Sequence, residues 1–171
     1  MEQSLDSSAM EIREVRPEEH AEAGRITRLA YAEFGAEDWG SDYADRLEDV
    51  AGRAAATLVL VAVEEGRILG CTTLELDGRI EGGHPRDPLA PDEAHMRMLG
   101  VDPRARGRGI GRALVEACIA EARRRGKLRL TLDTTEEMTA ARAMYSSMGF
   151  ERRPDKVWPD GFRLLAFELR L

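Results

Sequence analysis

Glycines and arginines alternate within one short segment of the 171-residue chain, residues 104–112. Glycines let the backbone approach an anion closely, and a helix that follows adds unpaired N–H groups and the positive end of its dipole. Arginines beside such a turn form charge-assisted hydrogen bonds with phosphate. The segment therefore predicts a pyrophosphate-binding turn. The residues expected to contact the phosphates are Arg106, Gly107, Arg108, Gly109, Ile110, Gly111 and Arg112.

Two common phosphate-binding motifs do not fit this segment. A dinucleotide fingerprint G-x-G-x-x-G that starts at Gly107 would need glycine at position 112, where the chain has Arg112. A P-loop needs a lysine directly after its last glycine, and the chain has none there. A glycine-rich turn between a strand and a helix, with solvated arginines, remains the structural alternative.

The pattern that does match is R-x-x-G-x-G, carried by Arg106, Gly109 and Gly111. With it the chain resembles the GNAT superfamily of acyl-CoA-dependent N-acetyltransferases. Residues 96–103 resemble the central strand of that family and its exit, and residues 140–150 resemble its second motif, A-x-x-L-Y-x-x-x-G-F. Two motifs in the right order make the resemblance more specific than one motif would.

The resemblance implies acetyl-CoA as cosubstrate and assigns roles to residues outside the turn. Backbone N–H groups around Leu99, Gly100 and Val101 are expected to contact the coenzyme and hold the oxyanion, at a bulge in the central strand. Tyr145 is implied to donate a proton to the departing thiolate, since a phenol with a pKa of about 10 can protonate a thiolate whose acid has a pKa of about 8.5. A core aromatic residue is the alternative for Tyr145.

The base that assists the amine is less well determined by the sequence. The family commonly places a glutamate on the central strand, and the matching position holds His95. We expect its pKa not far from about 6.5, shifted by burial or by the neighbouring Glu93. Glu93, Glu75 and His84 are competing candidates, and an ordinary hydrogen-bonded histidine is the structural alternative for His95.

Hydrophobic periodicity predicts the elements that position these residues. Strands are expected over 11–15, 57–63, 68–76, 95–101, 128–132 and 165–171, and helices over 17–34, 43–56, 110–125 and 139–148. Residues 77–91 are expected to form a long irregular loop. The order of elements predicts a single α/β domain over residues 10–171, with a mixed, mainly antiparallel sheet flanked by helices, after a loose tail over residues 1–9.

Composition limits the classes of function. Hydrophobic residues make up 43% and charged residues 33% of the chain, which excludes a disordered polar chain and a bundle of membrane spans. The formal charge of −7 disfavours binding to nucleic acid or to anionic membranes. Cys71 and Cys118 lack the spacing of a disulfide framework or a metal site, and the three histidines also lack metal-site spacing. The first ten residues are not expected to form a signal peptide. A reducing cytoplasm fits best, and no metal site is expected.

The sequence thus predicts an N-acetyltransferase that moves an acetyl group from acetyl-CoA directly to a primary amine of a small molecule or peptide. The helix pair over 17–56 and the loop over 77–91 should shape the acceptor pocket, and a homodimer is compatible with this interpretation. Two alternatives remain: a non-catalytic acyl-CoA-binding sensor, and a nucleic-acid-binding domain that uses the arginine cluster.

Overall fold

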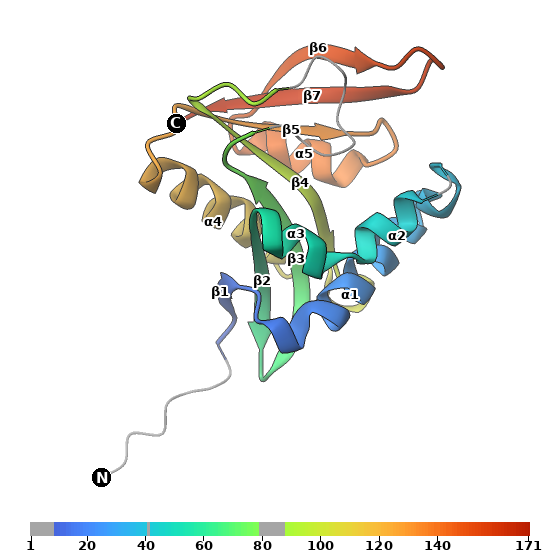
Figure 1. The fold of residues 1–171 in the computed structure, drawn as a ribbon, viewed down its shortest axis with the longest axis vertical. Coiled ribbons are helices and arrows are strands. Elements are labelled where there is room, and N and C mark those ends of the chain that lie inside the picture. The colour runs from blue at the N-terminus through green and yellow to red at the C-terminus, as the bar shows by residue number, and fades with distance from the viewer. Residues whose placement is uncertain (1–8, 41, 79–87) are drawn as a thin grey trace. The chain divides into compact units, whose positions relative to one another are not determined.

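The computed structural model of the chain describes residues 9–40, 42–78 and 88–171 (Figure 1). His84 and most of the expected tail and of the expected loop over 77–91 lie outside the described residues. The helices are α1 (His20–Ala32), α2 (Tyr43–Glu48), α3 (Val50–Ala56), α4 (Ile110–Arg124) and α5 (Thr139–Ser147), with short 3-10 turns at Pro17–Glu19 (η1), Ala36–Asp38 (η2) and Pro103–Ala105 (η3). The strands are β1 (Glu11–Glu14), β2 (Leu58–Glu64), β3 (Arg67–Glu75), β4 (Glu93–Val101), β5 (Arg129–Thr134), β6 (Glu151–Val157) and β7 (Arg163–Arg170).

The strands form one seven-stranded sheet in the order β1-β2-β3-β4-β5-β7-β6. β4 and β5 are parallel, whereas β1 pairs with β2, β5 with β7, and β6 with β7 in antiparallel register. This confirms the predicted mixed, mainly antiparallel sheet flanked by helices. The parallel ladder joins residues 93–96 of β4 to residues 129–132 of β5.

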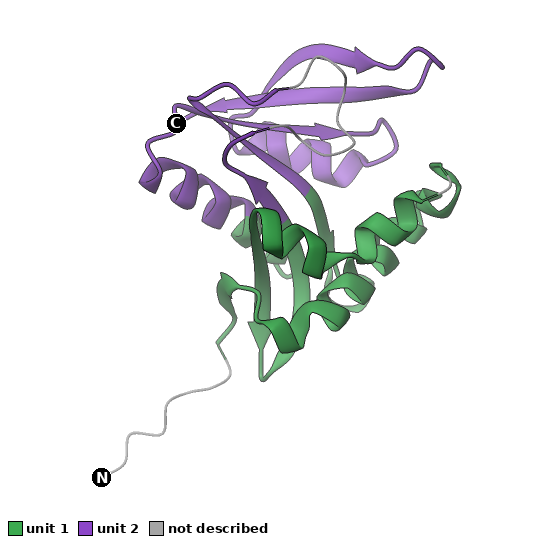
Figure 2. Ribbon diagram, viewed as in Figure 1, with its two compact units in different colours: residues 1–72, 98–114 green, residues 73–97, 115–171 purple. Residues whose placement is uncertain are grey.

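The chain divides into two compact units, drawn in green and purple in Figure 2: residues 1–72 with 98–114, and residues 73–97 with 115–171. In the first unit, the fully buried side chains of Ile26 and Val50 pack with Val61 of β2 in one apolar cluster. α1 also crosses β4 closely, because a Cβ atom added at Gly100 would lie 3.1 Å from the Cβ of Ala30.

In the second unit, α5 covers an apolar sheet face. The Tyr145 ring lies 6.1 Å from the ring of Phe167 on β7, measured between centroids, and Leu130 and Leu132 of β5 are buried. Because side chains alternate along a strand, the residues between these leucines point to the opposite face. That face of β5 carries the polar residues Thr131 and Asp133.

Two elements differ from the sequence predictions. β6 was not predicted, because it contains five charged residues and a proline and therefore lacks apolar alternation. It is the edge strand of the sheet, where proline is tolerated, and its register with β7 shifts between Arg153 and Lys156. The predicted helix over 43–56 is interrupted at Asp49, whose side chain accepts a hydrogen bond from the Gly52 N–H at 2.9 Å and so caps a new helix.

Candidate active site

The glycine and arginine turn leads from η3 into α4, within the first unit. Asp102 is buried and its carboxylate accepts a hydrogen bond from the Arg104 N–H at 2.9 Å, which fixes the exit from β4. Gly107 and Gly109 have φ angles of +79° and +77°, in the left-handed region that side chains rarely adopt. A Cβ atom at either glycine would meet no heavy atom within 4 Å, so the backbone of the turn is open to a ligand.

The N-terminus of α4 supplies hydrogen-bond donors to this turn. The Ala113 N–H donates to the Gly109 carbonyl at 3.0 Å. The N–H groups of Ile110 and Gly111 precede that bond, and the first N–H groups of a helix point out of its N-terminus with the positive end of the dipole. The local structure is therefore suited to an anion, as the sequence predicts.

Two arginines of the turn contact carboxylates of the same unit. The Nη1 atom of Arg106 lies 2.6 Å from Oε1 of Glu33, and its Nη2 atom donates to the Ala30 carbonyl at 3.4 Å. The Nη2 atom of Arg108 lies 2.7 Å from Oε1 of Glu64. The Arg108 guanidinium holds the pKa of the Glu64 carboxyl below its ordinary value.

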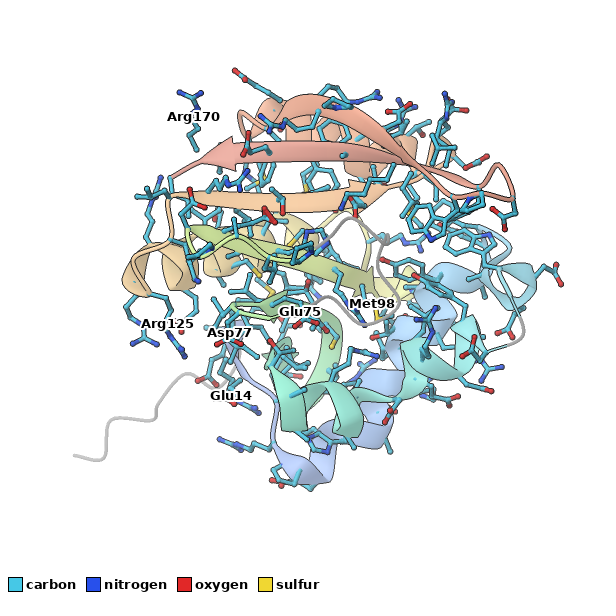
Figure 3. The ribbon with its side chains drawn as sticks, turned by 45° about the horizontal axis from the view of Figure 1, so that its top comes forward. Glu14, Glu75, Asp77, Met98, Arg125 and Arg170 are labelled. Atoms are coloured by element: carbon cyan, nitrogen blue, oxygen red, sulfur yellow. The ribbon has the colours of Figure 1, made fainter. Side chains whose placement is uncertain are left out.

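β4 carries a backbone irregularity at Met98, which is labelled in Figure 3. Its φ angle is +54°, unusual for a residue that is not glycine. The irregularity lies one residue before the predicted segment of Leu99, Gly100 and Val101, and these three residues lie beyond the ladder with β5, which ends at Met96. Because β3 pairs with the other edge of β4, only the N–H groups of this segment that point away from β3 are available for a ligand.

His95 lies on the polar face of the sheet in the second unit and is only 3% exposed. Its Nδ1 atom is 2.8 Å from the Thr131 hydroxyl oxygen. Burial first, and then the charges of Lys156 and Arg97, lower the pKa of His95 to about 3. The expected pKa near 6.5 is therefore wrong, because the sequence did not show how completely the sheet buries the ring. His95 is a neutral hydrogen-bonding residue at ordinary pH.

Asp133 and Lys156 complete this polar group and were missed by the sequence analysis. Oδ2 of Asp133 lies 3.7 Å from Nε2 of His95 and 3.0 Å from the Lys156 ammonium nitrogen. The nearby carboxylate would favour a charged imidazole, but Lys156 already compensates its charge, and burial dominates. The register of β5 could have placed Asp133 on the face of His95, whereas Lys156 comes from the unpredicted strand β6.

The other candidate bases of the second unit are held in ion pairs. Glu93 is 3.3 Å from Arg129, which also lies 3.1 Å from Glu168, so Glu93 belongs to a charge cluster at the start of β4. Glu75, labelled in Figure 3, ends β3, and its carboxylate lies 3.8 Å from the Nε atom of Arg97. The Glu75 side chain is 13% exposed.

Tyr145 is 5% exposed on α5, and its ring packs against those of Phe150 and Phe167. Burial raises the pKa of its hydroxyl above the ordinary value. The phenol therefore stays protonated and can donate a hydrogen bond over the whole working range of pH. The tight aromatic packing also shows that Tyr145 contributes to the core.

A model of the acetyltransferase (GNAT) family matches residues 22–150, which include the turn, β4, α4 and α5. The chain belongs to the GNAT acetyltransferase family. Among relatives, a protein of Arthrobacter sp. (strain FB24) called mycothiol acetyltransferase is 35% identical over 134 residues, which are 78% of this chain and 35% of that protein. The chain spans only part of several such mycothiol acetyltransferases, between 21% and 38% of their length.

Solved structures share the fold of this GNAT-family chain. Ribosomal-protein-alanine N-acetyltransferase from Brucella melitensis superposes with a TM-score of 0.71 at 25% identity, covering 94% of this chain and 99% of that one. YncA of Salmonella typhimurium, solved with its cofactor acetyl-CoA, has a TM-score of 0.72 at 24% identity, covering 95% of this chain and 94% of that one.

Two features are absent from the part of the chain that the structure describes. In residues 9–40, 42–78 and 88–171, no three His, Cys, Asp or Glu side chains are grouped as metal ligands. Within the same described residues, none of the helices has the length and apolar character needed to cross a membrane.

Proposed function

We propose that the chain transfers an acetyl group from acetyl-CoA to a primary amine of a small molecule or peptide. The observation that carries the proposal is the turn at the start of α4, where two left-handed glycines, helix N–H groups and two arginines occur together. These groups suit the pyrophosphate of coenzyme A. Family membership supports the same assignment, and YncA, which shares the fold, was solved with acetyl-CoA.

Each part of the turn has a proposed task in binding the coenzyme. The N–H groups of residues 109–111 donate to the pyrophosphate, and the open backbone at Gly107 and Gly109 lets the phosphates approach. Arg106 and Arg108 add charge-assisted hydrogen bonds. Those backbone N–H groups of residues 99–101 that point away from β3 donate to the pantetheine arm and to the acetyl carbonyl oxygen as it gains negative charge.

Acetyl-CoA supplies the acetyl group as a reactive thioester. A C–N bond to the amine forms, the C–S bond breaks, and the electron pair leaves with sulfur. We assign to Tyr145 the role of donating a hydrogen bond to the leaving sulfur atom. Because burial raises the pKa of Tyr145, full proton transfer to a thiolate is uphill, and the phenol stabilises the leaving sulfur by donating a hydrogen bond.

For the proton that the amine loses, we assign Glu75 in place of His95. The imidazole of His95, with a pKa of about 3, binds a proton too weakly to take it from an amine. Glu75 is a partly accessible carboxylate beside Arg97 on the second unit. It would accept the proton directly or through water. His95 instead has a positioning role on the polar face of the sheet, through its hydrogen bond with the Thr131 hydroxyl.

The proposal is tested by incubating the chain with acetyl-CoA and a panel of amines, among them polyamines, amino sugars, cysteine conjugates and peptide N-termini. Release of free thiol that depends on one amine, together with mass-spectrometric detection of the acetylated amine, is the expected result. Tight binding of coenzyme A without transfer to any amine would favour the non-catalytic sensor. Failure to bind coenzyme A would refute the proposal.

A further inference from the structure

We propose that Glu33 and Glu64 are internal counter-anions of the coenzyme turn, and that they lower the affinity for coenzyme A by competing with its phosphates for Arg106 and Arg108. This inference rests on the proposed function, since it takes the turn as the phosphate site. It adds two residues that no motif of the turn contains.

The geometry places one carboxylate on each arginine. Glu33 follows the last residue of α1, and Glu64 is the last residue of β2, so two separate elements bring acidic groups to the same turn. The N–O distances are 2.6 Å for Arg106 with Glu33 and 2.7 Å for Arg108 with Glu64. Both distances are typical of direct, charge-assisted hydrogen bonds.

A guanidinium binds carboxylate and phosphate through the same fork of N–H donors. A coenzyme phosphate that takes these donors must therefore displace the glutamate or share the arginine with it. Displacement is inexpensive here, because three of the side chains are exposed and that of Glu64 is partly exposed: 39% for Arg106, 46% for Glu33, 47% for Arg108 and 25% for Glu64. Exposed ion pairs contribute little to stability, so the fold does not depend on them.

The two arginines differ in how firmly they are held. Arg106 has a second contact, from its Nη2 atom to the Ala30 carbonyl near the C-terminal end of α1. Arg108 contacts Glu64 through one nitrogen. Removal of the Glu64 charge should therefore release Arg108 fully, whereas Arg106 keeps one anchor when the Glu33 charge is removed.

Glu37 provides a matched control in the same unit. It pairs with Arg28 at 2.9 Å and is 48% exposed, close to the exposure of Glu33, but Arg28 is not part of the turn. The substitution Glu37→Gln changes the net charge by the same amount as Glu33→Gln or Glu64→Gln, from −7 to −6. Any difference between these variants therefore reports the contact with the turn rather than the net charge.

The experiment is calorimetric titration of coenzyme A into the wild type, Glu33→Gln, Glu64→Gln, Glu37→Gln and the double variant. We expect each of the first two substitutions to tighten binding about 1.5- to 5-fold, and the double variant to show roughly the product, because the two ion pairs share no residue. Glu37→Gln should bind like the wild type. The gain in affinity should shrink as the salt concentration is raised. Pantetheine lacks the phosphates, so its inhibition of the acetyltransferase should be the same in the wild type and in the glutamine variants.

The sign of the effect decides the inference. Weaker binding by Glu33→Gln and Glu64→Gln would mean that the glutamates position the arginines for the phosphates, and would overturn it. Affinities equal to that of Glu37→Gln would overturn it as well. A separate variant, Gly109→Asn, tests the turn itself: if coenzyme A binds that variant normally, the proposed phosphate site fails and the inference fails with it. If Gly109→Asn binds weakly but the glutamine variants show no gain, only the inference fails.

Discussion

The buried state of His95 makes a quantitative prediction about stability and pH. The pKa of His95 is about 3 in the folded chain, against about 6.5 for an unperturbed histidine. Between these two values the unfolded chain binds one proton more than the folded chain does, so the free energy of unfolding falls as pH falls. Each pH unit is worth about 1.4 kcal/mol per proton. His95 should therefore reduce stability by roughly 2 to 3 kcal/mol between about pH 7.5 and pH 4.5.

Replacement by glutamine isolates this contribution. His95→Gln removes the ionisation, so the stability of the wild type relative to this variant should fall by roughly 2 to 3 kcal/mol over that pH interval. For a chain of this length the relative change in Tm is roughly 4 to 12 °C. Thermal or urea unfolding followed by circular dichroism at both pH values measures it. Thr131→Val is the matched control, because it removes the 2.8 Å hydrogen bond but keeps the imidazole.

Three charged groups face the His95 ring. They are Asp133, Lys156 and Arg97, and all three remain in the Thr131→Val variant, which also keeps the imidazole. The Thr131→Val control should therefore retain the full pH dependence of the wild type. A stability difference between the wild type and His95→Gln that is the same at both pH values would refute the buried, neutral state of His95.

Three further substitutions test the packing and the proposed chemistry. Gly100→Ala should lower the free energy of unfolding by about 1 to 3 kcal/mol in urea unfolding, because the added Cβ atom would lie 3.1 Å from Ala30; wild-type stability would contradict the close crossing of α1 and β4. Tyr145→Phe should reduce kcat about 10²-fold in stopped-flow assays of the chemical step, with nearly unchanged acetyl-CoA affinity; unchanged kcat would leave Tyr145 with a packing role alone. Glu75→Gln should reduce kcat/KM about 10²-fold or more, whereas His95→Gln should reduce it much less; the opposite result would return the role of base to His95.

The sequence predicted best those features that depend on neighbouring residues. The turn over 104–112 and the amphipathic helix after it could be predicted because glycine spacing and apolar periodicity are local properties. The interruption at Asp49 was missed, although a capping aspartate three residues before Gly52 is also a local signal. β6 could not be predicted, since an edge strand exposed to water needs no apolar face.

The electrostatic environment of the site depends on contacts between distant residues. The pKa of His95 is set by burial under the folded sheet, which no local pattern encodes. Lys156 contacts Asp133, which lies 23 residues away in the sequence, and Glu33 contacts Arg106, which lies 73 residues away. The sequence therefore did not show the ionisation state of His95 or these ion-pair partners.

The central claim, that the turn at the start of α4 binds coenzyme A, is tested most directly by one pair of substitutions. Gly109→Asn introduces a residue that tolerates the φ angle of +77°, and its side chain would enter the open space beside the turn where the phosphates are expected to lie. Gly66→Asn is the control, because Gly66 has a φ angle of +74° and also no heavy atom within 4 Å of an added Cβ, in the turn between β2 and β3. Calorimetry should show coenzyme A binding at least about tenfold weaker for Gly109→Asn and unchanged for Gly66→Asn. Wild-type affinity in a folded Gly109→Asn variant would contradict the account.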